Sequence, residues 1–174
     1  MASFLRSASL TGLVVVLSAV ALAAQQSSRS TMERADRFVG TWILNVEKST
    51  FEGAAAPKSS IRTFDYEREN TILCTAHTVS ASGEPSFVHY LITLDGREYE
   101  ELSRSWSPDR SPTFVSARKV SEDRIDLTFK RAGRIFIWHW WTVSDQGGTL
   151  TIRRKSSTAQ GKPTSYVMVY EKQQ

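Results

Sequence analysis

The sequence is nearly free of cysteine, and its single thiol, Cys74, excludes an internal disulfide. Only three histidines are present, and no phosphate-binding loop, nucleophile motif, paired-carboxylate signature or metal-ligand spacing occurs. These absences favour a binding protein over an enzyme and give no reason to expect a cofactor or a bound metal. Because Cys74 stands in an alternating segment, we expect a small buried apolar residue there rather than a reactive thiol.

Long hydrophobic runs are also lacking, except near the N-terminus. Arg6 precedes an apolar stretch from Leu10 to Leu22, which is interrupted by small and polar residues. That stretch is shorter than the roughly 20 residues of a membrane-spanning helix. The sequence Ala21-Leu22-Ala23 fits the small-x-small rule of signal peptidase, which places the cleavage before Ala24. The alternative is that Ala24 is the last residue removed. We therefore predict that residues 1–23 are a signal peptide, that the mature chain is periplasmic or secreted, and that it has no stable membrane anchor.

A strong charge of one sign is missing too, since the formal net charge is only +4. The one basic run, Arg153-Arg154-Lys155, lies in a strand pattern, where successive side chains point to opposite faces. This alternation excludes a continuous phosphate-binding stripe. Nucleic acid is therefore not an expected partner.

What the sequence does contain is alternation of apolar and polar residues with a period of two, rich in β-branched and aromatic residues. Residues 24–37 are expected to be flexible or to form a short helix, and residues 38–174 to form one β domain. The predicted strands are Val39–Asn45, Ile61–Arg68, Ile72–Ser80, Phe87–Leu94, Tyr99–Leu102, Thr113–Val120, Arg124–Arg131, Arg134–Val143, Thr149–Ser156 and Ser165–Glu171.

Short turn signals separate most of these strands, so neighbouring strands must be antiparallel hairpins. An up-and-down meander of about 8–10 strands can hide its two edges by closing into a barrel. We therefore predict an all-β, antiparallel barrel. The longer segment from Val46 to Ser60 is interpreted as a loop that covers one mouth of the barrel.

The segment Gly40-Thr41-Trp42 resembles the Gly-x-Trp motif that opens the first strand of the calycin group, the lipocalins and fatty-acid-binding proteins. Together with Asn45, Lys48-Ser49-x-Phe51 and the closing Val169-Tyr170-Glu171-Lys172, it is also similar to a group of small secreted bacterial proteins of unassigned function. The resemblance implies a barrel with a cavity for an apolar small molecule, with Trp42 at the closed end against a late arginine. The chain departs from the family in two ways: it lacks an Arg-x-Tyr clamp near the C-terminus, and a disulfide is impossible.

Hairpin geometry gives a prediction of which side chains share a face. A two-residue turn at Ala132-Gly133 would place Phe129 opposite Phe136, Leu127 opposite Trp138 and Ile125 opposite Trp140. A two-residue turn at Glu122-Asp123 would place Arg118 opposite Leu127 and Ser116 opposite Phe129, within the same apolar face. Ile135, Ile137, Trp141 and a surface pair of His139 with Asp126 would then lie outside, where a homodimer is one candidate for covering the apolar stripe. A one-residue change in register would exchange the faces.

These arguments select eight candidate ligand-binding residues and no catalytic residue. They are Trp42, Ser116, Arg118, Leu127, Phe129, Phe136, Trp138 and Trp140. The predicted partner is an apolar small molecule, in the sharper form a lipid-like acid whose head group Arg118 recognises. Alternatively, Arg118 stacks on Trp42 and closes the barrel. An enzyme that uses the same cavity, and a filled barrel that serves as an interaction module, are the competing functions.

Overall fold

The computed structural model describes residues 36–101, 112–144, 146–157 and 161–173. The predicted signal peptide, its cleavage site and nearly all of the flexible or short helical segment 24–37 lie outside these residues. The described residues contain no helix. Accordingly, no helix among them is long and apolar enough to cross a membrane.

Ten strands form a single antiparallel sheet in the order β4-β3-β2-β1-β10-β9-β8-β7-β6-β5. This order is a meander along the chain in which β1 and β10 are neighbours, and it confirms the predicted all-β fold. The strands are β1 (Gly40–Glu52), β2 (Ser59–Arg68), β3 (Thr71–Val79), β4 (Pro85–Thr93), β5 (Asp95–Glu100), β6 (Thr113–Ser121), β7 (Arg124–Arg131), β8 (Arg134–Val143), β9 (Thr149–Ser157) and β10 (Pro163–Lys172).

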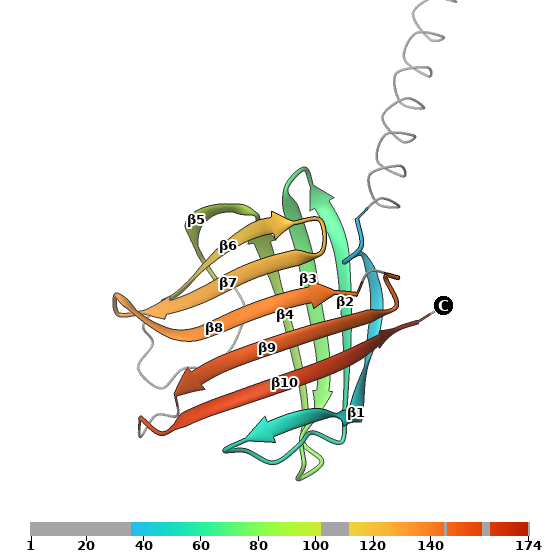
Figure 1. Cartoon of the computed structure of the whole chain (residues 1–174). Coiled ribbons are helices and arrows are strands. Elements are labelled where there is room, and N and C mark those ends of the chain that lie inside the picture. The colour runs from blue at the N-terminus through green and yellow to red at the C-terminus, as the bar shows by residue number, and fades with distance from the viewer. Residues whose placement is uncertain (1–35, 102–111, 145, 158–160, 174) are drawn as a thin grey trace, which may run out of the picture. The chain divides into compact units, whose positions relative to one another are not determined.

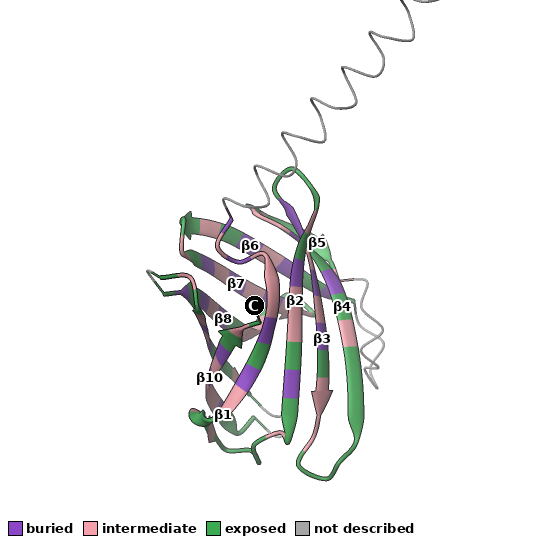
Figure 2. Cartoon of the chain, turned by 90° about the vertical axis from the view of Figure 1, so that its right-hand side faces the viewer, coloured by how far each residue is buried: buried purple, intermediate pink, exposed green. Residues whose placement is uncertain are grey.

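The sheet curls into a nearly closed barrel, in which β2–β4 cross β7–β10 at a steep angle (Figure 1). Buried and exposed residues alternate along the strands, as Figure 2 shows for β1–β4, because each strand presents one face to the interior. Across the interior, the rings of Tyr90 on β4 and Phe129 on β7 meet edge to face, with their centroids 6.1 Å apart. Cys74 is a buried free thiol, as predicted.

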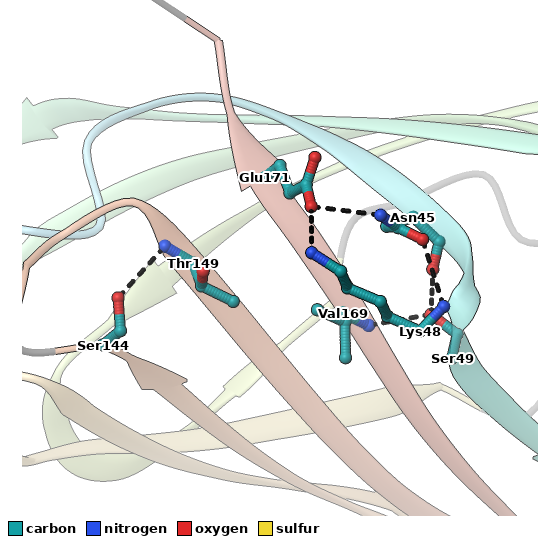
Figure 3. A network of polar contacts seen from close by, with 7 residues as sticks. All are labelled: Asn45, Lys48, Ser49, Ser144, Thr149, Val169 and Glu171. Carbon is teal, nitrogen blue, oxygen red and sulfur yellow. Dashed lines mark hydrogen bonds and ion pairs between the residues drawn. The ribbon is translucent and has the colours of Figure 1, made fainter.

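The first strand is longer than predicted because it continues through an irregularity in its pairing with β10 between Asn45 and Thr50. Side chains from both strands hold this irregularity together (Figure 3): Asn45 Nδ2 donates to Glu171 at 3.0 Å, and Lys48 Nζ contacts the same carboxylate oxygen at 2.8 Å. Ser49 Oγ donates to the carbonyl of Asn45 at 2.6 Å and accepts the amide of Val169 at 2.9 Å. Asn45, Lys48-Ser49 and the closing strand, which belong to the second resemblance, therefore meet in one polar network.

The predicted loop from Val46 to Ser60 is thus wrong in its extent. Residues 46–52 belong to β1, and Ser59 and Ser60 begin β2. The remaining connection begins at Gly53, whose φ of 81° lies in the left-handed region. A side chain at this position would also approach the backbone carbonyl of Pro163 to 3.3 Å, so glycine suits both the turn and the close contact.

Both predicted hairpin turns are confirmed, but the faces derived from them are wrong beyond the turns. Arg131 pairs with Arg134 across Ala132 and Gly133, which have φ of 47° and 73° as a type I′ turn requires. The register then shifts between Phe129 and Lys130, which leaves Phe136 as an extra residue on β8. A similar shift leaves Val120 as an extra residue on β6, next to the turn between β6 and β7. Each bulge moves its strand by one residue and therefore exchanges its faces.

Consequently Ile125 pairs with Trp141 and Leu127 with His139, whereas Trp138 and Trp140 lie on the outer face. Trp141 is completely buried and His139 is 6% exposed, so neither belongs to the surface as predicted. Ile137, also expected outside, packs partly buried against the core. The core cluster fills the barrel from Trp42 on β1 to Leu150 and Ile152 on β9.

Candidate functional site

The barrel interior is filled at one end and hollow at the other. The hollow has a volume of about 270 Å³ and is lined by β1, β2, β3, β8, β9, β10 and the connections next to them. Its lining residues are Phe51, Ala54, Ala55, Pro57, Ser60, Arg62, Thr78, Ser80, Ala81, His139, Arg154, Tyr166, Met168 and Tyr170. Ala54, Ala55 and Ala81 are exposed, and they mark its mouth. Part of the predicted covering loop therefore does border a mouth of the barrel.

Three nitrogen-bearing side chains enter this hollow from three strands. Arg62 stands on β2, His139 on β8, and Arg154 on β9, where it is paired with His139. Each faces inward because it follows the alternation of its strand: Phe64 on β2, Trp141 on β8 and Ile152 on β9 are buried two residues away. The sheet thus gathers three nitrogen-bearing residues, two arginines and one histidine, around one cavity.

The protonation of His139 is fixed by its neighbour on the same strand. Trp141 Nε1, which can only donate, is 3.3 Å from His139 Nδ1, so this ring nitrogen is the acceptor. Burial, together with the charges of Arg154 and Arg62, lowers the pKa of His139 well below its ordinary value, so the imidazole is neutral. Its proton is therefore on Nε2. That nitrogen is buried and has no hydrogen-bond partner among the described residues.

The two arginines are held by aromatic rings and hydroxyls. Arg62 Nε donates to the hydroxyl of Tyr170 at 3.0 Å. Arg154 lies over the ring of Tyr166, with Cζ 5.4 Å from the centroid, while its buried Nε has no partner. Burial and the charge of Arg62 lower the pKa of Arg154, but arginine stays protonated in proteins. Within the part of the chain that the structure describes, neither guanidinium forms an ion pair with a carboxylate.

The hollow therefore presents hydrogen-bond donors and positive charge without a matching acceptor. A buried donor without a partner costs about 1–3 kcal/mol, and a buried charge costs more. A bound group that offers only acceptors, above all an anion, would remove this cost. The remaining lining combines the hydroxyl-bearing residues Ser60, Thr78, Ser80 and Tyr170 with apolar surface from Phe51, Tyr166, Met168 and the alanines at the mouth.

None of the eight residues predicted to bind ligand lines this hollow. Trp42, Leu127 and Phe129 are buried in the core, as expected for the apolar face. Phe136 sits in the β8 bulge, half-buried, with the guanidinium of Arg131 4.8 Å from its ring centroid. Whether any of these four contacts a ligand stays a prediction.

The other four predicted residues lie on the outer face, which corrects the assigned register. Ser116 pairs with Thr128, and Arg118 pairs with Asp126 and is exposed. Trp138 and Trp140 lie beside them on β8. Arg118 therefore neither enters the barrel nor stacks on Trp42. The cation over the Trp42 ring is Lys172, with Nζ 5.1 Å from the centroid, in the place where the resemblance implied an arginine.

The site residues that the sequence analysis missed carried a weak signal. Arg154 was in the basic run whose alternation was recognised, but no hairpin fixed which of the three residues faces inward. Arg62 is a polar residue of the predicted strand Ile61–Arg68, and nothing in the sequence marks it as facing the interior. His139 was considered and placed on the wrong face by one residue, because the bulge at Phe136 leaves no clear mark in the sequence.

No family model and no curated protein matches the sequence. Among solved structures, the wild-type fluorescent protein UnaG aligns with 13% identity over 80% of this chain and 99% of its own, at a TM-score of 0.52. A single-residue mutant of UnaG gives 14% identity, 79% and 96% coverage, and a TM-score of 0.51. This likeness shows the fold. The chain has the same kind of antiparallel up-and-down β-barrel as these structures, which confirms the predicted fold.

Proposed function

We propose that this protein is an exported carrier or scavenger that binds a small amphipathic carboxylic acid inside its barrel. The carboxylate accepts hydrogen bonds from His139, Arg154 and Arg62, and the apolar part of the ligand lies against the apolar lining. The observation that carries the proposal is the pair of buried, unpartnered donors, His139 Nε2 and Arg154 Nε, in the wall of one cavity.

An ionised carboxylate matches this wall because it has acceptors and no donor. The wall also contains a guanidinium that forms no ion pair among the described residues, so an anion adds an electrostatic partner that a neutral acceptor lacks. A cation or a pure hydrocarbon would leave the donors unpaired. The unpaired donors therefore favour an acidic ligand, and Met168, Tyr166 and Phe51 provide the surface that its apolar part contacts.

The size of the hollow limits the ligand. A volume of about 270 Å³ lies near the lower end of the usual range of ligand pockets, about 300–1,000 Å³. We therefore expect a medium-chain acid or a compact ring acid rather than a long fatty acid. The signal peptide predicted for residues 1–23 supports a role outside the cytoplasm, where such a ligand would be collected or sequestered.

The test compares decanoic acid with its methyl ester by isothermal titration calorimetry. We expect the acid to bind and the ester to bind far more weakly. Arg154→Met should weaken binding of the acid by about 10- to 150-fold, which corresponds to about 1.5–3 kcal/mol for a hydrogen bond to a charged group. Arg153→Met is the matched control, because Arg153 is the preceding residue of β9 and is exposed on the opposite face.

Two results would contradict the proposal. Equal affinity for the acid and the ester would show that the cavity does not recognise the charge. Equal loss of affinity in Arg154→Met and Arg153→Met would show that the net charge of the protein, and not the interior guanidinium, attracts the acid. Recovery of the unaltered protein from the cytoplasm with residues 1–23 intact would remove the exported part of the proposal alone.

A further inference from the structure

A second surface with ligand-binding character lies outside the barrel. The register shift in β8 turns Trp138 and Trp140 outward, and Trp138 is 37% exposed although exposed tryptophans are uncommon. Around them on β6, β7 and β9 stand basic side chains. We call this surface the outer tryptophan face and define it by Arg118, Arg124, Trp138, Trp140, Arg153 and Lys155.

Strand pairing fixes where the cations lie. Lys155 is opposite Trp138, and Arg153 is opposite Trp140. Among the described residues, two carboxylates are strand partners of this face: Asp95 pairs with Arg118, and Asp126 lies opposite Trp140, where Arg124 binds it with two hydrogen bonds of 2.7 and 3.0 Å. Among the described residues, Arg153 and Lys155 form no ion pair. The face therefore keeps an excess of positive charge next to two indole rings.

The face is also hollowed on both sides of Trp140. A depression of about 510 Å³ is lined by Trp140 with Arg124, Arg153, Lys155 and Val167 among others. A smaller one, of about 240 Å³, lies between Trp140 and Trp138 and includes Arg118 in its wall. An anionic group seated in either depression would meet a guanidinium or ammonium, while any chain attached to it would contact an indole ring.

We propose that the outer tryptophan face docks on the surface of a bilayer that contains anionic phospholipids. Tryptophan is enriched at the membrane interface because its ring is apolar and its N–H is polar. Lys and Arg near an anionic leaflet contribute about 1 kcal/mol each. The cations are spread over three strands of a broad sheet, which fits a two-dimensional array of head groups better than the single phosphate line of a polynucleotide.

The proposal rests on the proposed function in one respect only: a carrier of an amphipathic acid has to collect or release its ligand at a membrane. The docking itself requires no ligand. It places the contact on the outer face of β6–β9, whereas the carboxylate site lies inside the barrel on β2, β8 and β9. The two proposals can therefore fail independently.

The experiment measures partitioning of the full-length mature protein onto vesicles by sedimentation, together with the shift of tryptophan emission. We expect binding to vesicles of phosphatidylcholine with phosphatidylglycerol, little binding to phosphatidylcholine alone, and weakening by salt. Arg153→Glu/Lys155→Glu should reduce partitioning at least tenfold, since each basic side chain near such a surface contributes about fivefold. Trp138→Ala should reduce both partitioning and the emission shift.

The matched control is Lys58→Glu/Arg68→Glu, which changes the net charge equally through two exposed residues beside and on β2. Equal losses in both double variants would overturn the proposal, because net charge alone would explain binding. Binding to single-stranded oligonucleotides with none to the anionic vesicles would overturn it in favour of a polynucleotide surface. His139→Gln changes a residue that lines the interior hollow and neither outer depression, so it should keep its vesicle binding whether or not it loses decanoic acid. Thermal melting confirms that each variant is folded.

Discussion

The two ends of the barrel interior are built from the same strands and have opposite chemistry. On each of three strands, two successive inward-facing residues differ: one is apolar and the other is basic. These pairs are Phe64 and Arg62 on β2, Trp141 and His139 on β8, and Ile152 and Arg154 on β9. Toward one end, rings and aliphatic chains fill the space. Toward the other, donors surround a hollow. The boundary between a stabilising core and a binding site therefore lies within single strands.

The filled end contributes packing, and none of its described residues has a buried side-chain polar atom without a partner. Phe64 and Trp141 lie with their ring centroids 5.0 Å apart, and Trp42 Nε1 donates to the carbonyl of Phe38 at 2.8 Å. Along β8, the hydrogen bond from Trp141 Nε1 to His139 Nδ1 joins the two ends. Stability at one end and pre-organisation of donors at the other are thus coupled through this contact.

Removing the largest side chain of the filled end should have the largest effect on stability. Trp141→Ala leaves a cavity at a completely buried position and should lower the free energy of unfolding by about 3–5 kcal/mol. Trp140→Ala, one residue away on the outer face, should change it by about 1 kcal/mol or less. Urea unfolding followed by circular dichroism measures both. Similar losses in the two variants would show that the assigned faces of β8 are wrong.

The hollow end should respond in the opposite direction. Arg154→Met replaces a buried charge that has no ion-pair partner among the described residues with an apolar chain of similar length. The free energy of unfolding of the ligand-free protein should rise by about 2 kcal/mol, within the range seen when buried charges are replaced by apolar residues. Arg153→Met on the outer face is the control and should change it by about 0.5 kcal/mol or less. A marked loss of stability in Arg154→Met would mean that the guanidinium supports the fold.

At the hollow end, His139 should make the stability of the protein depend on pH. Burial lowers the pKa of His139 below the ordinary 6.5, so the unfolded chain takes up a proton at a higher pH than the folded chain. The stability is complete above pH 6.5 and decreases as the pH falls toward the folded pKa, with a slope of about 1.4 kcal/mol per pH unit. Urea titrations between pH 7 and about 5 measure this slope. His139→Gln should flatten it, and the exposed His77→Gln should not.

The fold could be predicted because its signals are local. Alternation predicted the strands, and short segments with Asp or Gly predicted the turns. Eight of the ten strands were placed within two residues at each end. The exceptions have physical reasons. β1 passes through an irregularity held by Asn45, Ser49 and Glu171, and β5 begins at the predicted turn Asp95-Gly96, whose pairing with β6 shifts. Such side-chain networks depend on partners far away in the sequence.

The site could not be predicted, because no turn signal showed which residue of Arg153-Arg154-Lys155 faces inward and because His139 depends on a bulge of one residue in β8. The register shifts beside Val120 and at Phe136 reverse the inward and outward faces of β6 and β8. They move Arg118 and Trp138 out of the barrel and His139 into it. The expectation of an acidic ligand survives as a proposal with a different arginine, because Arg154 has a buried Nε without a partner and no carboxylate beside it among the described residues.

The smallest effect is expected from a hydroxyl in the wall of the hollow. Ser60 is buried, and its Oγ lies 3.0 Å from Thr78 Oγ1 and 3.4 Å from the hydroxyl of Tyr170. Ser60→Ala removes these contacts, but Tyr170 keeps its bond with Arg62 and the hollow has room for water to replace the lost oxygen. The free energy of unfolding should therefore fall by only about 1 kcal/mol, the net value of one hydrogen bond. Denaturant unfolding measures it. A loss as large as that of Trp141→Ala would mean that this end of the barrel is as tightly packed as the other, and the contrast between the two ends would then be wrong.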